Sequence, residues 1–291
     1  MKPSKLLAPF RIDAPKRFRL ADIDPAETAG FKKDQADKLL AGLTERLGEL
    51  QERLFAEDKW AVLVVLQALD AAGKDSAIKR VMAGLNPQGC VVHPFKVPTA
   101  DELDHDFLWR AALRLPPRGD IGIFNRSYYE EVLVVRVHEE LLQKQKLPAG
   151  RVGPRIWQER FEDINAFERH LVRSGTLVLK FHLRISKEEQ KKRLLERVDD
   201  PTKRWKFSMQ DVEERKLWSR YMAAYQDMIR HTSTPEAPWY VVPADHKWFG
   251  RLVIATAIVD TLERFELEFP KIDGARLREM KRIRKALAGN G

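Results

Sequence analysis

The chain has 291 residues, of which 44% are hydrophobic, so it can bury one large core and is close to the upper length of a single domain. Its one cysteine, Cys90, excludes an internal disulfide and a cysteine-based metal site, and is typical of a reducing cytoplasm. No apolar run reaches the roughly 18 residues of a membrane span, and no signal-peptide core is present, so we expect a cytoplasmic protein without membrane contact.

The net charge of +9 would suit a polyanionic partner, but the charge is concentrated at the two ends of the chain. Residues 1–20 carry a net charge of +5 and residues 270–291 also carry +5, which leaves −1 between them. A basic end segment is more often solvated, or in contact with another subunit, than a specific binding site. The overall charge therefore gives no argument for a nucleic-acid partner.

The first predicted element is a long amphipathic helix that begins after residue 30. Its apolar residues are spaced alternately by four and three, which is typical of a helix packed lengthwise against a partner in the same chain or in another subunit. These positions are Ala36, Leu40, Leu43, Leu47, Leu50 and Leu54. A buried strand follows at residues 60–67, then a tight turn and a helix, and then a second strand at residues 90–95.

The middle of the chain continues this alternation. Thr99 and Glu102 form a capping-box pattern that predicts a helix through Leu113, and a third strand follows at residues 120–124. Residues 127–137 are rich in β-branched side chains but come directly after a strand, so strand and helix are both open, and we favour a helix.

The last part of the chain supplies two more strands. Pro154 and Gly175 bracket a helix of about 20 residues. Strands follow at residues 176–185 and 239–242, with helices at 186–197, 208–231 and 247–265. Five strands alternating with helices predict an α/β fold, a parallel five-stranded sheet flanked by helices, whose ligands bind beyond the carboxyl ends of the strands.

The turn after the first strand, in LQALDAAGKDSAIKRV, can be a phosphate cradle or an ordinary strand-to-helix turn. Small residues allow backbone N–H groups to surround a phosphate beside a helix N-terminus. The residues of this cradle would be Ala71, Ala72, Gly73, Asp75 and Ser76. The strict P-loop signature is not met, because Ala68 stands at the first glycine position and Asp75 at the hydroxyl position.

Two charged residues of this turn are candidates for chemistry. Lys74 would place its ammonium on a transferred phosphoryl group. Asp70 faces the same space and would be repelled by polyphosphate unless a metal lay between them, so it is a candidate Mg²⁺ ligand. The alternative is that Asp70 caps the helix at Gly73.

The stretch DIGIFNRSYYE, residues 120–130, ends a strand in polar residues. Asn125 stands where P-loop phosphotransferases usually carry a metal-binding Asp, so either Glu130 or Glu131 would have to supply the missing charge. A structural turn role for Asn125 is equally open. Arg126 is placed to bind phosphate oxygens or, alternatively, to pair with Glu130.

The stretch QKKRLLERVDDPTKRWKF, residues 190–207, is strongly basic. Such a run is usually a solvated helix face, but its position in a Pro-containing loop favours a mobile lid, packed down by Trp205, over an anionic substrate. The lid cations would be Arg197, Lys203, Arg204 and Lys206, with Arg110 from the helix near residue 110.

Four stretches in this order resemble the polyphosphate kinase 2 family: LQALDAAGKDSAIKRV, FKVPTADELDHDFLWR, IFNRSYYEEVLVVRV and DDPTKRWKF. The Asn of FNRS and the EEVLVVRV continuation are similar to class III of the family, which phosphorylates AMP and ADP. The resemblance covers residues 30–265 and implies a P-loop kinase fold with a helical lid, Mg²⁺ dependence, and a homo-oligomer, either tetramer or dimer. By motif, it makes Asp70 and Lys74 the Walker A pair, with Asp70 and Asn125 as metal ligands.

We therefore expect an enzyme that reversibly transfers the terminal phosphoryl group of inorganic polyphosphate to AMP or ADP. Its catalytic residues would be Asp70, Lys74, Asn125, Arg126 and Glu130. The domain would span residues 31–269 with a lid at about 190–210, between a basic arm at 1–30 and a basic tail at 270–291. The alternatives are an ATP-dependent kinase of small nucleotides and a nucleic-acid-binding protein that uses the basic ends.

Overall fold

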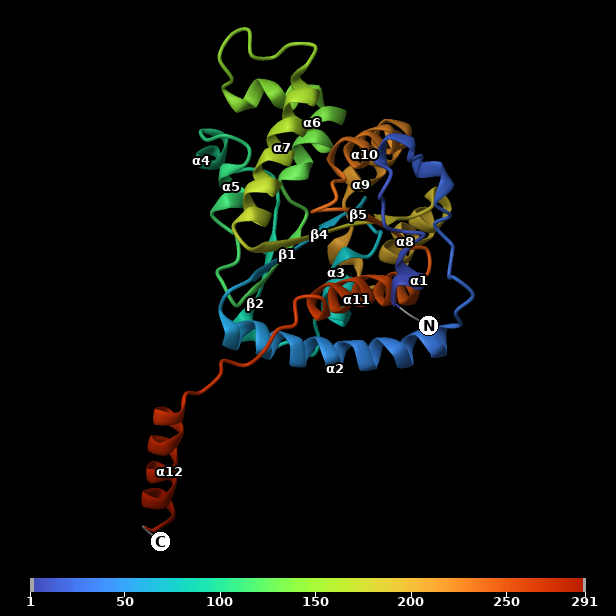
Figure 1. Cartoon of the computed structure of the whole chain (residues 1–291). Helices are drawn as coiled ribbons and strands as arrows, with labels where there is room; N and C mark the ends of the chain where they lie inside the picture. Colours follow the sequence, from blue (N-terminus) through green and yellow to red (C-terminus); the bar gives the residue numbers. More distant parts are fainter. Residues whose placement is uncertain (1–2, 290–291) are drawn as a thin grey trace.

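The computed structural model describes residues 3–289, so the outermost residues of both predicted basic segments, 1–2 and 290–291, lie outside it. Its centre is a parallel sheet of five strands in the order β2-β3-β1-β4-β5 (Figure 1). The strands are β1 (Ala61–Gln67), β2 (Cys90–Pro94), β3 (Ile121–Asn125), β4 (Thr176–Arg184) and β5 (Trp239–Pro243). The prediction of a parallel five-stranded α/β fold is confirmed.

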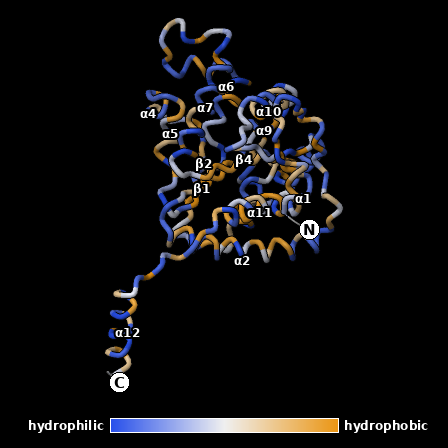
Figure 2. The backbone as a smooth tube through the Cα atoms, viewed as in Figure 1, coloured by the Kyte–Doolittle hydropathy of each residue, from blue (hydrophilic) through white to orange (hydrophobic). Residues whose placement is uncertain are grey.

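The position of β1 at the centre of the sheet explains why its residues are apolar on both faces. All seven of its residues are buried, because it lies between β3 and β4 and has helices above and below. Val62, Val64 and Leu66 point into one core layer, whereas Leu63 and Val65 point into the other. Figure 2 shows the apolar residues gathered along these central strands.

One face of the sheet is covered by α2 and α11. The helices of this layer are α1 (Pro3–Leu7), α2 (Lys33–Glu57), α3 (Lys74–Val81) and α11 (Lys247–Glu263). The predicted amphipathic helix is α2, and its partner α11 is in the same chain, which decides between the two open possibilities. Because α11 lies between α2 and the sheet, it is apolar nearly all round.

The other face is covered by α7 and α10. Its helical segments are η4 (Tyr128–Val132), α6 (Val134–Val137), η5 (Glu139–Gln145), α7 (Ile156–Arg173) and α10 (Trp218–Thr232). Between α7 and the sheet, the fully buried Lys180 ammonium is 2.6 Å from Glu168 and donates to the Thr232 carbonyl at 2.7 Å. The hydroxyls of Tyr128 and Tyr129 each donate to Glu168 at 2.7 Å, so the buried charges are paired and hydrogen-bonded.

Several predicted helices are shorter than expected. The capping box at Thr99 is present, but the helix splits into α4 (Ala100–Leu103) and α5 (Trp109–Ala112), because the Asp106 side chain accepts a hydrogen bond from the Leu108 N–H between them. The favoured helix at 127–137 is helical, in the short pieces η4 and α6. The predicted helix at 208–231 is broken at Leu217 into α9 (Met209–Lys216) and α10.

The remaining elements lie in loops and at the chain ends. They are η1 (Pro15–Arg17), η2 (Leu20–Asp22), η3 (Pro87–Gly89), α8 (Lys187–Asp199), η6 (Arg204–Lys206) and α12 (Gly274–Ala288). The N-terminal segment packs on the body, burying Leu7 and Phe10 and bonding to β5, which the sequence did not predict. No helix within residues 3–289 is both long and apolar enough to cross a membrane.

Candidate active site

The phosphate turn lies between the carboxyl end of β1 and the first residue of α3. Ala71 and Gly73 have left-handed backbone conformations, with φ of 66° and 111°. Glycine adopts this conformation without strain, and a Cβ at Gly73 would lie 3.4 Å from the Ser76 hydroxyl. A compact turn of small residues that leads directly into a helix N-terminus is a geometry suited to phosphate groups.

Lys74 is the first residue of α3, and its side chain folds back across the turn. Its Nζ donates to the carbonyl oxygen of Ala68 at 2.8 Å and lies 3.5 Å from that of Leu69. Burial, together with the nearby charge of Arg126, lowers the pKa of Lys74 to about 8. A buried ammonium with carbonyl partners alone is a positive charge available to an anionic ligand.

Arg126 connects the phosphate turn to the end of β3. Its guanidinium donates to Asp70 at 2.6 Å and to Glu130 at 2.9 Å, and its backbone is left-handed, with φ of 64°. Glu130 and Asp70 raise the pKa of Arg126 above its ordinary value. Burial opposes the ionisation of Asp70, but Lys74 and Arg126 hold its pKa below the ordinary value. Two cations and two carboxylates therefore alternate at the turn.

These contacts decide between the alternatives that the sequence left open. The N-cap of α3 is Gly73, and the Asp70 carboxylate accepts from Arg126, so the capping role for Asp70 is wrong. The ion pair of Arg126 with Glu130 is present, and the Arg126 side chain is still 30% exposed to the space above the turn. Exchange of a carboxylate for a phosphate oxygen at Arg126 thus requires no change of fold.

Asn125 ends β3 and faces α3. Its Nδ2 donates to Asp75 at 2.9 Å, so the structural turn role with a backbone partner is wrong. Its Oδ1 is buried and has no hydrogen-bond partner within the part of the chain described. Buried acceptors are nearly always satisfied in folded proteins, so this oxygen is a candidate ligand for a cation or a substrate donor.

A cleft of about 430 Å³ opens beside the phosphate turn. Its lining includes Asp70, Arg126, Glu130, Asp211 and Tyr225. Arg197 of α8 pairs with the lining residue Asp211 at 2.8 Å, and is not itself among the lining residues. Cavities of this size hold ligands as large as a nucleotide.

The basic side chains of the loop after α8 contact mainly the loop itself and the end of α8. Lys203 pairs with Asp200 at 2.9 Å, and the Arg204 Nε donates to a main-chain carbonyl of α8. Lys206 comes within 4.0 Å of the Asp75 carboxylate next to the turn. The structure therefore places the loop beside the site with one cation reaching toward it.

Three predicted side chains lie elsewhere. Glu131 is buried and pairs with Arg160 at 3.2 Å, so of the two glutamates only Glu130 remains at the site, and the carboxylate in contact with Asn125 is that of Asp75. Arg110 is held by the Lys96 carbonyl at 2.8 Å, outside the lining of the cleft. Trp205 is 78% exposed, so the prediction that it packs the loop down is wrong; it stacks under the Lys206 ammonium, with 4.9 Å to the ring centroid.

The sequence did not single out Arg193 of α8, which is central to the turn. It is buried and forms an i,i+4 pair with Glu189 at 2.9 Å, which was visible in the sequence as an ordinary helix pair. Its other donors fasten α8 to the phosphate turn and to the loop before α11, at 2.7 to 3.1 Å. The acceptors are the carbonyl oxygens of Ala71, Ala72, Ala244 and Asp245.

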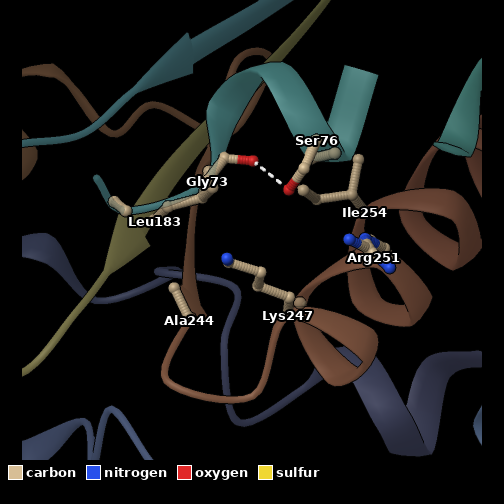
Figure 3. A pocket seen from close by; sticks show the side chains of 10 residues that line it. Gly73, Ser76, Leu183, Ala244, Lys247, Arg251 and Ile254 are labelled. Atoms are coloured by element: carbon tan, nitrogen blue, oxygen red, sulfur yellow. Dashed lines mark hydrogen bonds between the residues drawn. The ribbon is translucent and has the colours of Figure 1, made fainter. Parts of the chain in front are cut away.

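The amino end of α11 adds two further cations under the turn. Lys247 and Arg251 line a small hollow with Gly73 and Ser76 (Figure 3). Burial and the charge of Arg193 lower the pKa of Lys247. The Arg251 Nε is buried with no hydrogen-bond partner among residues 3–289. Positive charge therefore surrounds the turn on the side away from the cleft as well.

The sheet order, the small-residue turn after β1 and the cations around it define a kinase of the P-loop class. The family model described as Polyphosphate kinase 2 (PPK2) matches residues 30–270. The chain belongs to this family, which confirms the resemblance seen in the sequence motifs.

Individual relatives are similar over nearly the whole chain. The ADP-polyphosphate phosphotransferase of Rhodopseudomonas palustris is 48% identical over 88% of this chain and 89% of its own length. The AMP/ADP-polyphosphate phosphotransferase of Meiothermus ruber is 47% identical over 91% of this chain and 96% of its own. The crystal structure of polyphosphate kinase 2 from Arthrobacter aurescens TC1 aligns over 96% of both chains, with a TM-score of 0.85 and 41% identity.

Proposed function

We propose that the chain is a Mg²⁺-dependent polyphosphate:AMP/ADP phosphotransferase that moves the terminal phosphoryl group of inorganic polyphosphate to AMP and ADP, and does so reversibly. The family membership supports transfer between polyphosphate and a nucleotide. The names of the Rhodopseudomonas and Meiothermus relatives support ADP and AMP as acceptors. These substrates also support a cytoplasmic location, and the assembly we expect is a homo-oligomer.

The observation that carries the proposal is the alternation of charges at the phosphate turn. Arg126 bonds both Asp70 and Glu130, and the charge of the nearby Lys74 helps to hold the pKa of Asp70 below its ordinary value. Phosphoryl transfer between two phosphates needs positioning and neutralisation of charge more than it needs a covalent nucleophile. Two cations and two carboxylates can position phosphate groups and neutralise their charge, and this needs no Ser, Cys or His nucleophile.

Each side chain then has a role in the transfer. Lys74 binds the transferring phosphoryl group, because its ammonium already lies within the turn. Arg126 releases one carboxylate and forks onto phosphate oxygens between donor and acceptor. Arg193 is a positioning residue: it holds the carbonyls of the turn so that the N–H groups keep their direction.

The residues that would hold Mg²⁺ are Asp70 and Asn125. The unpartnered, buried Oδ1 of Asn125 fits an oxygen-binding cation, and Mg²⁺ commonly uses only one or two protein groups and completes its shell with water and substrate phosphates. The residues within 3–289 include no group of three or more His, Cys, Asp or Glu that would form a dedicated metal cage. When bound, the ion would neutralise the phosphate charge that Asp70 otherwise repels.

The cleft beside the turn suits the nucleotide. Its volume of 430 Å³, with the Tyr225 ring in its wall, has the size for a nucleotide acceptor. The hollow on the other side, lined by Lys247 and Arg251, has a volume of about 10 Å³ and is too small for a phosphate chain, so these two cations would act on the turn through their charge. The basic loop with Lys206 is the lid that would close over the phosphates.

A luminescence assay for ATP tests the proposal. The purified chain is incubated with Mg²⁺, ADP and polyphosphate as the only other phosphate source, and separately with AMP and polyphosphate. ATP from ADP is the expected product of the first reaction, and ADP from AMP, followed by chromatography, is that of the second. Lys74→Ala should lower both rates by about 10² to 10⁴. An ATP-dependent kinase of AMP can form ATP from two ADP, so the control omits polyphosphate. ATP formation that does not depend on polyphosphate, or no ATP at all, would reject the proposal.

A further inference from the structure

The C-terminal helix α12 stands apart from the rest of the molecule (Figure 1). Every residue from 268 to 289 is exposed, although α12 carries an apolar stripe at helical spacing. The stripe consists of Leu277, Met280, Ile283 and Leu287, which are between 46% and 76% exposed. A helix of 15 residues is only marginally stable alone in water, so the stripe indicates a partner surface.

The charge of α12 narrows the choice of partner. The helix has six Lys or Arg and one Glu, a net charge of +5. Two copies of α12 would repel each other, which argues against direct pairing of the two helices. Arg276 and Arg284 are each four residues from Met280, so they lie on the same face of α12 as the stripe. A fitting surface must therefore combine exposed apolar side chains with uncompensated carboxylates.

Such a surface lies where α2 ends beside β2 and β3, and we call it the acceptor patch. It consists of Phe55, Asp58, Val92 and Asp120. Two glycines show that these side chains are neighbours. A Cβ built on Gly89 would lie 3.3 Å from the Phe55 ring and 3.7 Å from the Asp120 carboxylate. A Cβ built on Gly119 would lie 3.5 Å from the Asp58 carboxylate. Val92 follows Cys90 by two residues and so points to the sheet face that α2 covers.

The acceptor patch is apolar and acidic. Phe55 is 54% exposed and Val92 is 42% exposed, on an edge strand of the sheet. Burial and the neighbouring Asp58 raise the pKa of Asp120, and the nearby Lys59 pairs with Glu57 instead. Within residues 3–289, neither aspartate has an ion-pair partner. The acceptor patch is therefore complementary to α12 in both polarity and charge.

The place where α12 leaves the body favours a second copy as the partner. The chain departs after the buried Leu267, and the Phe265 ring packs on Trp60, two residues after Asp58, with 4.8 Å between centroids. Each copy thus carries its helix and its acceptor patch at the same end of the molecule, separated by the six-residue linker 268–273 (Figure 1). A two-fold axis at this end would bring the helix of one copy to the acceptor patch of the other, and the reverse, in a single interface.

We propose that α12 docks its apolar stripe on the acceptor patch of a second copy of the chain, and that the two copies exchange these helices reciprocally. Arg276 and Arg284, on the face of the stripe, then meet Asp58 and Asp120 of the other copy. This contact is independent of the proposed phosphotransferase activity, since neither surface includes a residue of the active site.

Sedimentation velocity of the full-length chain over a range of concentrations tests the exchange. The helix variant is Leu277→Asp with Ile283→Asp, and its matched control is Ala275→Asp, which lies outside the stripe on the far side of α12. The patch variant is Phe55→Asp, with Asp58→Lys as a milder second variant. Helix and patch variants should each weaken self-association at least tenfold, and the α12 amides should lose hydrogen-exchange protection to the same extent, whereas the control should match the wild type.

A mixing experiment separates helix exchange from any other interface. The helix variant retains an intact acceptor patch, and the patch variant retains an intact α12, so an equimolar mixture should associate although neither variant does so alone. The exchange is overturned if the mixture stays dissociated, if both variants keep the wild-type mass and protection, or if wild-type α12 is protected only when anionic phospholipid vesicles are added.

Discussion

The proposed role of Lys74 predicts that the activity falls in the alkaline range. Its pKa of about 8 belongs to the free enzyme, in which burial and Arg126 oppose the charged form. The pH dependence of kcat/KM reports the groups of the free enzyme, so kcat/KM for polyphosphate should fall as Lys74 loses its proton. The sign is fixed: a lysine is charged below its pKa and neutral above it.

The magnitude follows from the same value. With a pKa of about 8, about nine-tenths of the enzyme carries the ammonium at pH 7 and about one-tenth at pH 9. We therefore expect kcat/KM for polyphosphate to drop about tenfold between pH 7 and pH 9, with a slope of one proton. Bound phosphate stabilises the ammonium, so kcat at saturating polyphosphate should hold to a higher pH than kcat/KM.

The assay measures initial rates of ATP formation from pH 6.5 to 10, at saturating ADP and a fixed concentration of free Mg²⁺. Lys74→Arg is the matched control, since a guanidinium keeps its charge over this range and should give a flat profile at a lower level. Lys74→Ala should cost about 10² to 10⁴ in turnover. A wild-type profile that is flat to pH 10, or a break near pH 8 that persists in Lys74→Arg, would refute this role of Lys74.

Three further outcomes test other parts of the site and the core. The lid variant neutralises Lys203, Arg204 and Lys206. It should weaken polyphosphate binding and its salt dependence more than nucleotide affinity; equal losses for both ligands would assign the loop to the nucleotide. Asn125→Asp places a second carboxylate next to that of Asp75, so Mg²⁺ should raise the Tm of the variant more than that of the wild type. The ratio of AMP to ADP turnover should also change. If neither the ratio nor the response of Tm to Mg²⁺ changes, Asn125 is not part of the site. Lys180→Met leaves Glu168 buried without its cation and should lower the free energy of unfolding by about 3–5 kcal/mol in urea titrations, whereas adding Glu168→Gln should restore part of it.

Much of the fold could be predicted because its signals are local. Each strand is a short apolar run bounded by polar residues, and parallel strands buried on both faces produce such runs. The turn at Gly73 and the polar end of β3 were also visible, since the chain order places both at carboxyl ends of strands. Sequence spacing alone could not show that Asp106 would interrupt a helix through its own side chain.

The parts of the site that the sequence missed depend on contacts between distant segments. Arg193 is separated from Ala72 by 121 positions, and nothing in its own helix distinguishes it from a solvated arginine. Lys247 and Arg251 reach the turn only because α11 starts beside β5 and α3. Glu130 and Glu131 are adjacent in sequence but point to opposite environments, the first to Arg126 and the second into the core.

The N-terminal segment has a practical consequence for how the protein is trimmed and tagged. Its main chain bonds to β5, with the Ile12 N–H donating to Trp239 at 2.9 Å and the Val241 N–H donating to Phe10 at 2.8 Å. The family match begins only at residue 30, so an expression boundary chosen from the match would remove this cover. The exposed rim of β5 would then offer free N–H and C=O groups to any other chain, which is a known route to aggregation. We therefore expect a product that begins at residue 30 to aggregate more readily than the full chain.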